Sequence, residues 1–279
     1  MNPEGRNAEG LPRWRKPGLP YGAALVSAAW LLWASPAREA AQAALVHPQR
    51  SPSTEGPWAL TFGEVTRAAP GKRQIALTFD ASGSADGLPA LLVALRHASV
   101  KCTFFLTGEW VQRYPKAARQ IVADGHEIGN HTWGHRDLTR LSDPEVAWEL
   151  QRAEAALHTV LGRPARPWFR APFGARNGRV LSVARARGYR SVYWSLDGFD
   201  AGRPGQPAAS IVSYVTAHPD EALDGAIIRF EVGDVPTAHA MAGVLRALEA
   251  RQLDPVPVST LVPAPDQKGH GSSHEALSR

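Results

Sequence analysis

Short apolar runs alternate with longer amphipathic segments from residue 74 onward. Short runs between turn signals are typical of buried strands, whereas apolar positions three and four apart are typical of helices that cover one face. The pattern predicts strands at residues 75–79, 102–106, 168–169, 192–194, 226–230 and 256–258, with another around Ile128. It predicts helices at residues 87–97, 115–123, 144–161, 179–187, 208–217 and 238–252.

Strands that alternate with helices of about 10 to 15 residues indicate parallel β-α units. About seven such units fit into residues 74–262, too short a stretch for a regular eight-stranded barrel. We therefore predict an α/β fold in which about seven parallel strands form a distorted (β/α) barrel. An open doubly wound sheet is the alternative, but no glycine-rich phosphate loop follows the first strand. A capping box of Ser142 and Glu145 is expected to start the helix at 144–161.

Residues 1–37 carry the pattern of a signal peptide or an N-terminal membrane anchor. Basic residues within 13–16 precede an uncharged, largely apolar stretch at 17–36, which is the order of a secretory signal. Small residues from Ser35 onward suit cleavage, but the stretch is also long enough to span a bilayer. Either reading places the rest of the chain outside the cytoplasm, secreted or anchored to the outer face of the cytoplasmic membrane. An amphipathic helix of a soluble core is the remaining alternative.

Three further segments follow. Residues 38–73 read as a linker, in which 58–65 is predicted to form a short flanking strand. Residues 74–262 are predicted to form one domain. Residues 263–279 are rich in glycine, serine and charge, and we expect them to be a disordered tail.

Composition excludes several classes of protein. Of 279 residues, 44% are hydrophobic and 20% charged, enough apolar material for a sizeable core. The single cysteine, Cys102, excludes an internal disulfide and multi-cysteine zinc sites, so any metal needs histidine and oxygen ligands; Cys102 itself is expected to be an inert core residue. The formal charge of +5 is scattered, so we expect no nucleic-acid partner but compatibility with an anionic envelope polymer. We expect a monomer.

Polar residues gather where the predicted strands end. In parallel β/α folds the catalytic groups collect at the carboxyl ends of strands, so these positions are candidates for a site. The candidates, in chain order, are Asp80, His131, His135, Arg170, Asp197, Asp200 and Glu231.

The strongest candidates for metal ligands are His131 and His135. Imidazoles four apart on one helical turn can reach a single cation, and zinc, cobalt, nickel or manganese would suit two imidazoles plus water. The same spacing recurs at His270 and His274, which we expect to be solvated histidines of the tail. What distinguishes the first pair is its place after a strand, beside Asp80. Structural histidines are the alternative.

Asp80 and Arg170 are predicted to interact. A carboxylate that follows an apolar strand needs a partner if it is buried, and Arg170 at an equivalent strand end can supply one. The alternatives are a helix N-cap for Asp80 and a surface ion pair for Arg170.

Five ordered segments carry a resemblance to a known family. They are Thr78-Phe79-Asp80, His131-Thr-Trp-Gly-His135, Arg170-Ala-Pro-Phe-Gly174, Asp197-Gly-Phe-Asp200 and the strand at residues 225–231. Over residues 74–262 the chain resembles the polysaccharide deacetylases, carbohydrate esterase family 4, the NodB-homology domain. The resemblance implies a distorted β/α barrel and metal-dependent removal of acetyl groups from N-acetylated or O-acetylated glycans such as chitin oligomers, peptidoglycan or xylan.

The resemblance also implies roles for the matching residues. Asp80 would be the catalytic base, with Arg170 orienting it. His131 and His135 would hold the metal, and a backbone N–H of the loop at 172–173 would help to stabilise the oxyanion. The remaining candidates are the supporting carboxylates Asp197 and Asp200 and the substrate-binding residues Pro172, Phe173 and Trp194.

Two departures from the family pattern concern its first and fourth motifs. The usual third metal ligand, an aspartate directly after the first, is Ala81 here, an Asp-Ala variant similar to a recognised subgroup. Ser82, Ser84, Asp80 or waters would then complete the coordination. The aromatic residue that commonly follows the fourth motif is Ala201.

A third departure is Glu231, which stands where the family has a histidine. It can act as general acid only if its pKa lies well above the ordinary value. A partly apolar strand end and the nearby Asp197 or Asp200 would raise the pKa of Glu231. Arg229 would lower it, because alternation along the strand places Arg229 on the same face as Glu231 and Phe230 on the other face. The alternative is a surface glutamate paired with Arg229.

Two functions therefore stay open at the level of sequence. The first is a secreted or membrane-anchored metal-dependent glycan deacetylase. The second is a catalytically decayed carbohydrate-binding or scaffolding protein on the same fold, which Ala81 and Glu231 would both favour.

Overall fold

The computed structural model of the chain describes residues 63–198, 200 and 206–262. The predicted signal or anchor at 1–37, the linker up to residue 62 and the tail at 263–279 lie outside these residues, as does Ala201. Within the described ranges, no helix is long and apolar enough to cross a membrane.

Seven parallel strands curl into a half-barrel, which confirms the predicted distorted (β/α) barrel. Their order across the sheet is β5 (Arg190–Ser191), β4 (Trp168–Phe169), β3 (Glu127–Asn130), β2 (Thr103–Leu106), β1 (Gln74–Ala81), β7 (Ile227–Glu231) and β6 (Leu196–Asp197). A further short strand, β8 (Asp254–Pro255), pairs with the beginning of β1.

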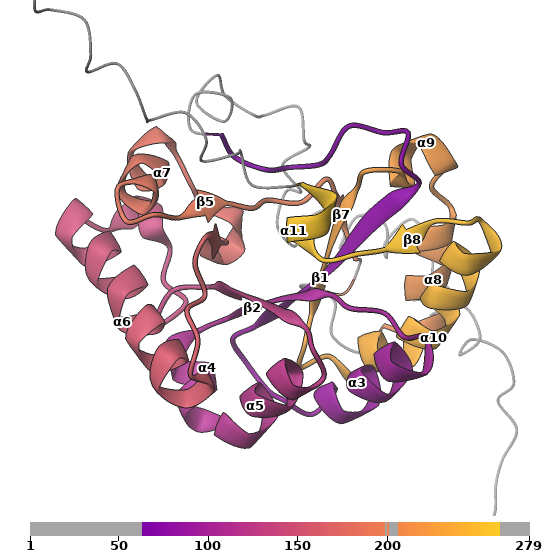
Figure 1. Ribbon diagram of the computed structural model, residues 1–279, viewed down its shortest axis with the longest axis horizontal. Coiled ribbons are helices and arrows are strands. Elements are labelled where there is room, and N and C mark those ends of the chain that lie inside the picture. Colours follow the sequence, from indigo (N-terminus) through magenta and orange to yellow (C-terminus); the bar gives the residue numbers. More distant parts are fainter. Residues whose placement is uncertain (1–62, 199, 201–205, 263–279) are drawn as a thin grey trace, which may run out of the picture. The chain divides into compact units, whose positions relative to one another are not determined.

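Helices cover the outer side of the curled sheet, whereas the short α11 (Val258–Leu261) packs on its inner side (Figure 1). The outer helices are α3 (Leu88–His97), α4 (Gly108–Arg113), α5 (Pro115–Ala123), α6 (Asp143–Leu161), α7 (Gly178–Arg185), α8 (Ala208–Thr216), α9 (Asp220–Leu223) and α10 (Val235–Ala250). There are 3-10 turns at Leu138–Arg140 and Pro172–Gly174. All six predicted helices are present. The pattern missed α4, α9 and α11, which are too short to display a helical period.

Local signals in the sequence set the ends of α6. The predicted capping box is present, and the Ser142 N–H donates to Glu145 Oε2 at 2.9 Å. The helix ends at Leu161 and is capped by Gly162, whose φ of 69° is left-handed and favours glycine.

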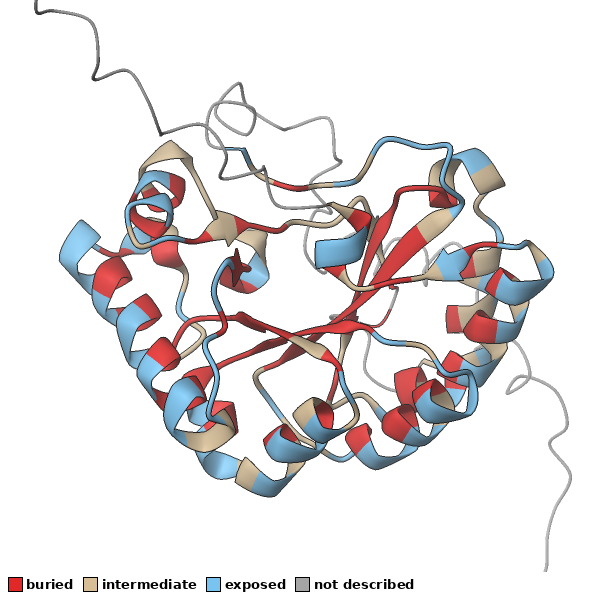
Figure 2. Ribbon diagram, viewed as in Figure 1, coloured by how far each residue is buried: buried red, intermediate tan, exposed pale blue. Residues whose placement is uncertain are grey.

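The core lies on both faces of the central strands, as expected for a parallel sheet covered by helices (Figure 2). In β1, Phe79 stacks on Phe104 and Phe230, with ring centroids 5.0 and 5.6 Å apart. Cys102 is buried in the same core, and burial raises the pKa of its thiol. It is therefore the inert core residue that the sequence predicts.

Two predicted strands are displaced. The run at 192–194 lies between β5 and β6, and Val192 forms only an isolated bridge, to Val65 of the predicted flanking strand. At 256–258 the pairing stops early, because Pro257 has no N–H to donate and α11 starts directly after it.

Candidate functional site

The site begins with a buried ion pair between the ends of β1 and β4. Thr78 and Asp80 point to the same side of β1 because side chains alternate along a strand. Arg170 directly follows β4 and is fully buried, and its Nη1 donates to Asp80 Oδ1 at 2.9 Å and to Thr78 Oγ1 at 2.8 Å. Its Nε also donates to the Val192 carbonyl at 3.2 Å, so the guanidinium is fixed.

This pairing controls the charge of Asp80. Burial by itself would raise the pKa of the carboxyl, but Arg170 with its hydrogen bond, His131 and Arg229 together outweigh burial and leave the pKa below its ordinary value. Asp80 is therefore ionised at neutral pH and able to accept a proton.

His131 lies directly beside Asp80. It follows β3, is buried, and places Nε2 at 3.8 Å from Asp80 Oδ2. Its Nδ1 is 2.9 Å from the Arg170 carbonyl oxygen, which can only accept, so Nδ1 carries the proton and Nε2 presents a lone pair. Burial lowers the pKa of His131, although Asp80 opposes this, so the ring is neutral rather than part of a salt bridge.

His135 completes the pair, but not on a helix. The segment at 131–135, called the histidine loop below, is irregular, with left-handed φ values of 69° at Thr132 and 55° at His135. The predicted helical turn is therefore wrong. The two imidazoles nevertheless meet, with ring centroids 5.0 Å apart, and burial lowers the pKa of His135 to about 4.

Two neutral imidazoles suit a borderline metal ion such as zinc. At the position where the family usually has its third metal ligand, this chain has Ala81, which is buried and apolar and offers no ligand atom. Across residues 63–198, 200 and 206–262, no three His, Cys, Asp or Glu side chains form a group that could hold a metal ion. Of the alternatives, Ser84 is engaged, since its Oγ accepts the Asp86 N–H at 2.9 Å. The residues thus fit a metal with two protein imidazoles and the remaining positions open to water or substrate.

A second charged cluster, centred on Arg229, lies beside this site. Nη1 of Arg229 donates to Glu231 Oε1 at 2.6 Å and Nη2 donates to Asp197 Oδ2 at 2.8 Å. The Glu231 N–H donates to Asp200 Oδ2 at 2.7 Å, and Glu231 is paired in register with Asp80 of β1. Arg229 and Glu231 thus share one face of β7, as predicted.

Surroundings raise the pKa of two carboxyls in this cluster. Burial raises that of Glu231 to about 8; Arg229 opposes the rise, and the negative charges of Asp80, Asp200 and Asp197 add to it. Burial likewise raises the pKa of Asp200 to about 6. Glu231 therefore combines an ion pair to Arg229 with a pKa above the ordinary value of a carboxyl, and its side chain is 32% exposed.

Aromatic residues border both clusters. Phe173 is 69% exposed, and its ring centroid is 4.5 Å from that of His135. The half-buried Trp194 ring lies 5.5 Å from the Arg170 guanidinium and 4.8 Å from that of Arg229. Pro172 is buried next to Phe173. The structure thus brings every predicted site residue into one continuous neighbourhood.

The Arg229–Glu231 pair that the sequence offers as an alternative is present, and Arg229 also links Glu231 to Asp197, which the sequence does not predict. A further supporting residue, Thr237, is likewise not predicted. Thr237 donates its hydroxyl to Asp200 Oδ2 at 2.9 Å from helix α10. Alternation along β7 was the available signal for Arg229; for Thr237, far along the chain, the sequence carries none.

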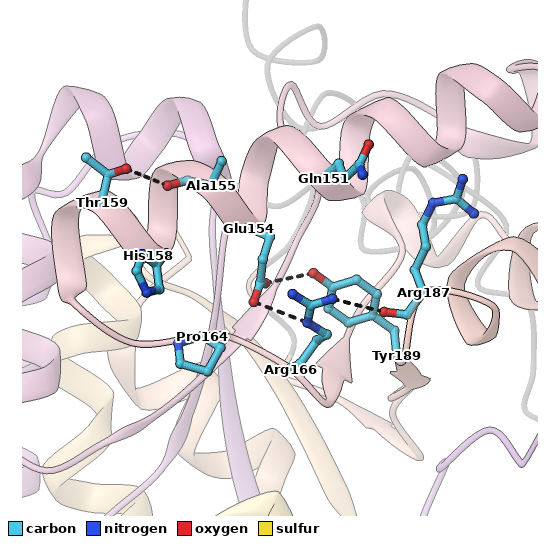
Figure 3. A pocket seen from close by; sticks show the side chains of 9 residues that line it. All are labelled: Gln151, Glu154, Ala155, His158, Thr159, Pro164, Arg166, Arg187 and Tyr189. Carbon is cyan, nitrogen blue, oxygen red and sulfur yellow. Dashed lines mark hydrogen bonds and ion pairs between the residues drawn. The ribbon is translucent and has the colours of Figure 1, made fainter.

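A cavity of about 450 Å³ beside α6 contains none of these residues (Figure 3). Glu154 lies at its wall and accepts the Tyr189 hydroxyl at 2.7 Å. The cavity is lined by Gln151, Glu154, Ala155, His158, Thr159, Pro164, Arg166, Arg187 and Tyr189. The strand-end cluster, not this cavity, concentrates the reactive groups.

Known proteins share this sequence and fold. The polysaccharide deacetylase family matches residues 67–192. A chitooligosaccharide deacetylase of Azorhizobium caulinodans is 33% identical over 210 residues, 70% of this chain and 99% of its own length. A peptidoglycan N-acetylglucosamine deacetylase of known structure aligns with a TM-score of 0.68 at 26% identity, covering 73% of this chain and 94% of that one. A pseudoenzyme of carbohydrate esterase family 4 from Bacillus anthracis aligns with a TM-score of 0.66 at 26% identity, covering 71% and 68%.

Proposed function

The chain belongs to the polysaccharide deacetylase family (carbohydrate esterase family 4, the NodB-homology domain), and from this premise we propose that it is a metal-dependent enzyme that removes acetyl groups from N-acetylated or O-acetylated glycans such as peptidoglycan or chitin oligomers. One observation carries the proposal: an ionised, arginine-paired Asp80 lies beside two neutral imidazoles at one edge of the sheet. Such groups suit hydrolysis of an acetyl group.

Members of this family generally depend on a metal. His131 and His135 would hold it here, and zinc is the metal we propose, with cobalt, nickel or manganese as alternatives. A bound divalent cation supplies Lewis acidity, which lowers the pKa of water and polarises the acetyl carbonyl.

Each protein group around the acetyl group then has a separate role. Asp80 takes the proton of the attacking water, and Arg170 holds the carboxylate in place. The backbone N–H of Phe173 donates to the developing oxyanion, since Pro172 has none to give. Glu231, protonated at neutral pH, gives its proton to the departing amine or alcohol. Phe173 and Trp194 provide apolar surfaces for sugar rings.

We expect turnover to fall as pH rises through about 8, because Glu231 loses there the proton that it must donate. Glu231→Gln should lower turnover by about 100-fold below that pH and remove the alkaline limb, because the amide has no proton to give. Glu249→Gln, an exposed position of α10, is the control. Equal pH profiles for wild type and Glu231→Gln would exclude Glu231 as the acid.

We propose further that the domain works outside the cytoplasm, as a secreted protein or anchored to the outer face of the membrane. The support is the basic, then apolar order of residues 13–36. Cell fractionation should therefore recover the chain from the envelope or medium. Recovery of the unprocessed chain from the cytosol would contradict the proposal.

A second candidate is a catalytically decayed carbohydrate-binding or scaffolding protein. Ala81 at the usual third ligand position favours it, as does the structural likeness to a pseudoenzyme. Metal content after dialysis separates the two candidates. A stoichiometric metal ion supports the enzyme, and a metal-free protein that still binds glycan supports the alternative.

A further inference from the structure

The histidine loop adopts a conformation that its own sequence does not favour. Thr132 and His135 both have left-handed φ values, which carry strain for residues with a Cβ atom. Such a conformation persists only where the surroundings hold it. The contacts of this loop therefore decide where the two imidazoles point.

Side-chain oxygens hold three consecutive amides of the loop. Asn130 Oδ1 accepts the Thr132 N–H at 2.8 Å. Glu149 Oε2, reaching up from α6, accepts both the Trp133 N–H at 2.9 Å and the Gly134 N–H at 2.8 Å. One carboxylate oxygen thus fixes two consecutive peptide groups of the four that connect the histidines.

Neighbouring elements hold the rest of the loop. The amides of Gly108 and Glu109, in the first turn of α4, donate to the Thr132 and Trp133 carbonyls at 3.0 and 3.2 Å. The Trp133 ring packs against alanines of α6, on the same helix as Glu149. A Cβ atom at Gly108 would lie 2.4 Å from the Trp133 ring, so α4 and the loop are in direct contact.

Glu149 is an unusual residue for this position. Its side chain is 1% exposed, and within the described part of the chain its Oε1 is buried without a hydrogen-bond partner. Burying a carboxylate is unfavourable, and helix packing alone is served as well or better by an apolar residue. Charge-assisted hydrogen bonds to two adjacent amides are what the carboxylate adds.

We propose that Glu149 is a positioning residue, which fixes the histidine loop so that His131 and His135 are presented together beside Asp80. Its effect on metal binding rests on the proposed function, whereas its effect on the loop does not. The carboxylate touches neither imidazole; it acts through the backbone of residues 133 and 134.

Glu149→Ala and Glu149→Gln test this inference against matched changes at Glu127. Glu127, the first residue of β3, also accepts two hydrogen bonds, from the Thr103 hydroxyl at 2.6 Å and from Trp168 Nε1 at 2.9 Å, but it lies at the end of β3 opposite to the histidine loop. Three quantities are measured in each variant: amide hydrogen exchange, the Zn²⁺ dissociation constant and the thermal unfolding midpoint.

We expect Glu149→Ala to speed exchange of the Trp133 and Gly134 amides by at least about tenfold while the β1 and β2 amides stay protected. Zn²⁺ affinity should fall by about 10- to 100-fold, as for other residues that orient metal ligands. Glu149→Gln should give exchange rates and a Zn²⁺ affinity between those of wild type and Glu149→Ala, because its amide oxygen still accepts hydrogen bonds. Glu127→Ala and Glu127→Gln should lower the unfolding midpoint without changing exchange at 133 and 134 or Zn²⁺ affinity.

Unchanged exchange at Trp133 and Gly134 in both Glu149 variants would overturn the inference, as would equal changes in the Glu127 variants. If Glu149→Ala does not fold, exchange in Glu149→Gln decides. If no variant, wild type included, binds Zn²⁺, the proposed function fails, and the exchange result still decides the role of Glu149.

Discussion

Replacing Asp80 by asparagine is expected to lower acetate release by about 1000-fold, within the range for loss of a general base. The asparagine still accepts a hydrogen bond from Arg170 but cannot take a proton from water. It also leaves the fully buried Arg170 charge without a countercharge, so stability should fall by about 3 kcal/mol. Initial rates and unfolding midpoints, measured well below the midpoint of the variant, separate the two effects.

Asp124→Asn is the matched control for this change. Asp124 also pairs with an arginine, Arg96, at 2.6 Å, but it lies before the amino end of β3. Its replacement should leave the rate unchanged. If Asp80→Asn keeps the wild-type rate, or if Asp124→Asn loses as much, Asp80 is not the base.

His131→Ala should abolish stoichiometric metal binding and with it the activity. The imidazole is neutral and its Nδ1 is held by the Arg170 carbonyl, so a single ring nitrogen faces Asp80. Loss of one of only two protein ligands leaves too few to retain the metal during dialysis. Metal content by elemental analysis gives the readout.

His126→Ala controls for the loss of a buried histidine. Burial lowers the pKa of His126 to about 4, and its Nδ1 accepts the Cys102 N–H at 3.2 Å, away from the strand-end cluster. This variant should lose stability but keep the metal. Retention of metal by His131→Ala, with loss in His126→Ala, would refute the assignment of the site.

The convergence of Asp80 and Arg170 was predictable because parallel strands place their carboxyl ends at one edge of a sheet. Alternation along a strand likewise predicted that Arg229 and Glu231 share a face. Both inferences require only the direction of the strands and the alternation of side chains between the two faces of a strand. The direction in which the pKa of Glu231 is shifted was not predictable, because it depends on how burial, Arg229 and three carboxylates balance in space.

The histidine loop shows why local pattern fails at a site. Spacing of four residues suggests a helical turn, but Thr132 and His135 are left-handed, and the backbone between them, at Trp133 and Gly134, is held by Glu149 from a different element, α6. Tertiary contacts thus override local preference at the point where the chemistry is placed. The predicted strand at 192–194 is also shaped by distant contacts, since Val192 donates to the Phe169 carbonyl of β4 and bridges to Val65, which lies more than 120 residues earlier in the chain.

Acetate release from N-acetylglucosamine oligomers, peptidoglycan and acetylated xylan, measured with Zn²⁺ and with chelator, tests the central claim most directly. We predict release from at least one N-acetylated glycan, its loss with chelator and its recovery when metal is restored. Folded protein that retains a stoichiometric metal ion yet releases no acetate from any of the three substrates would contradict the account.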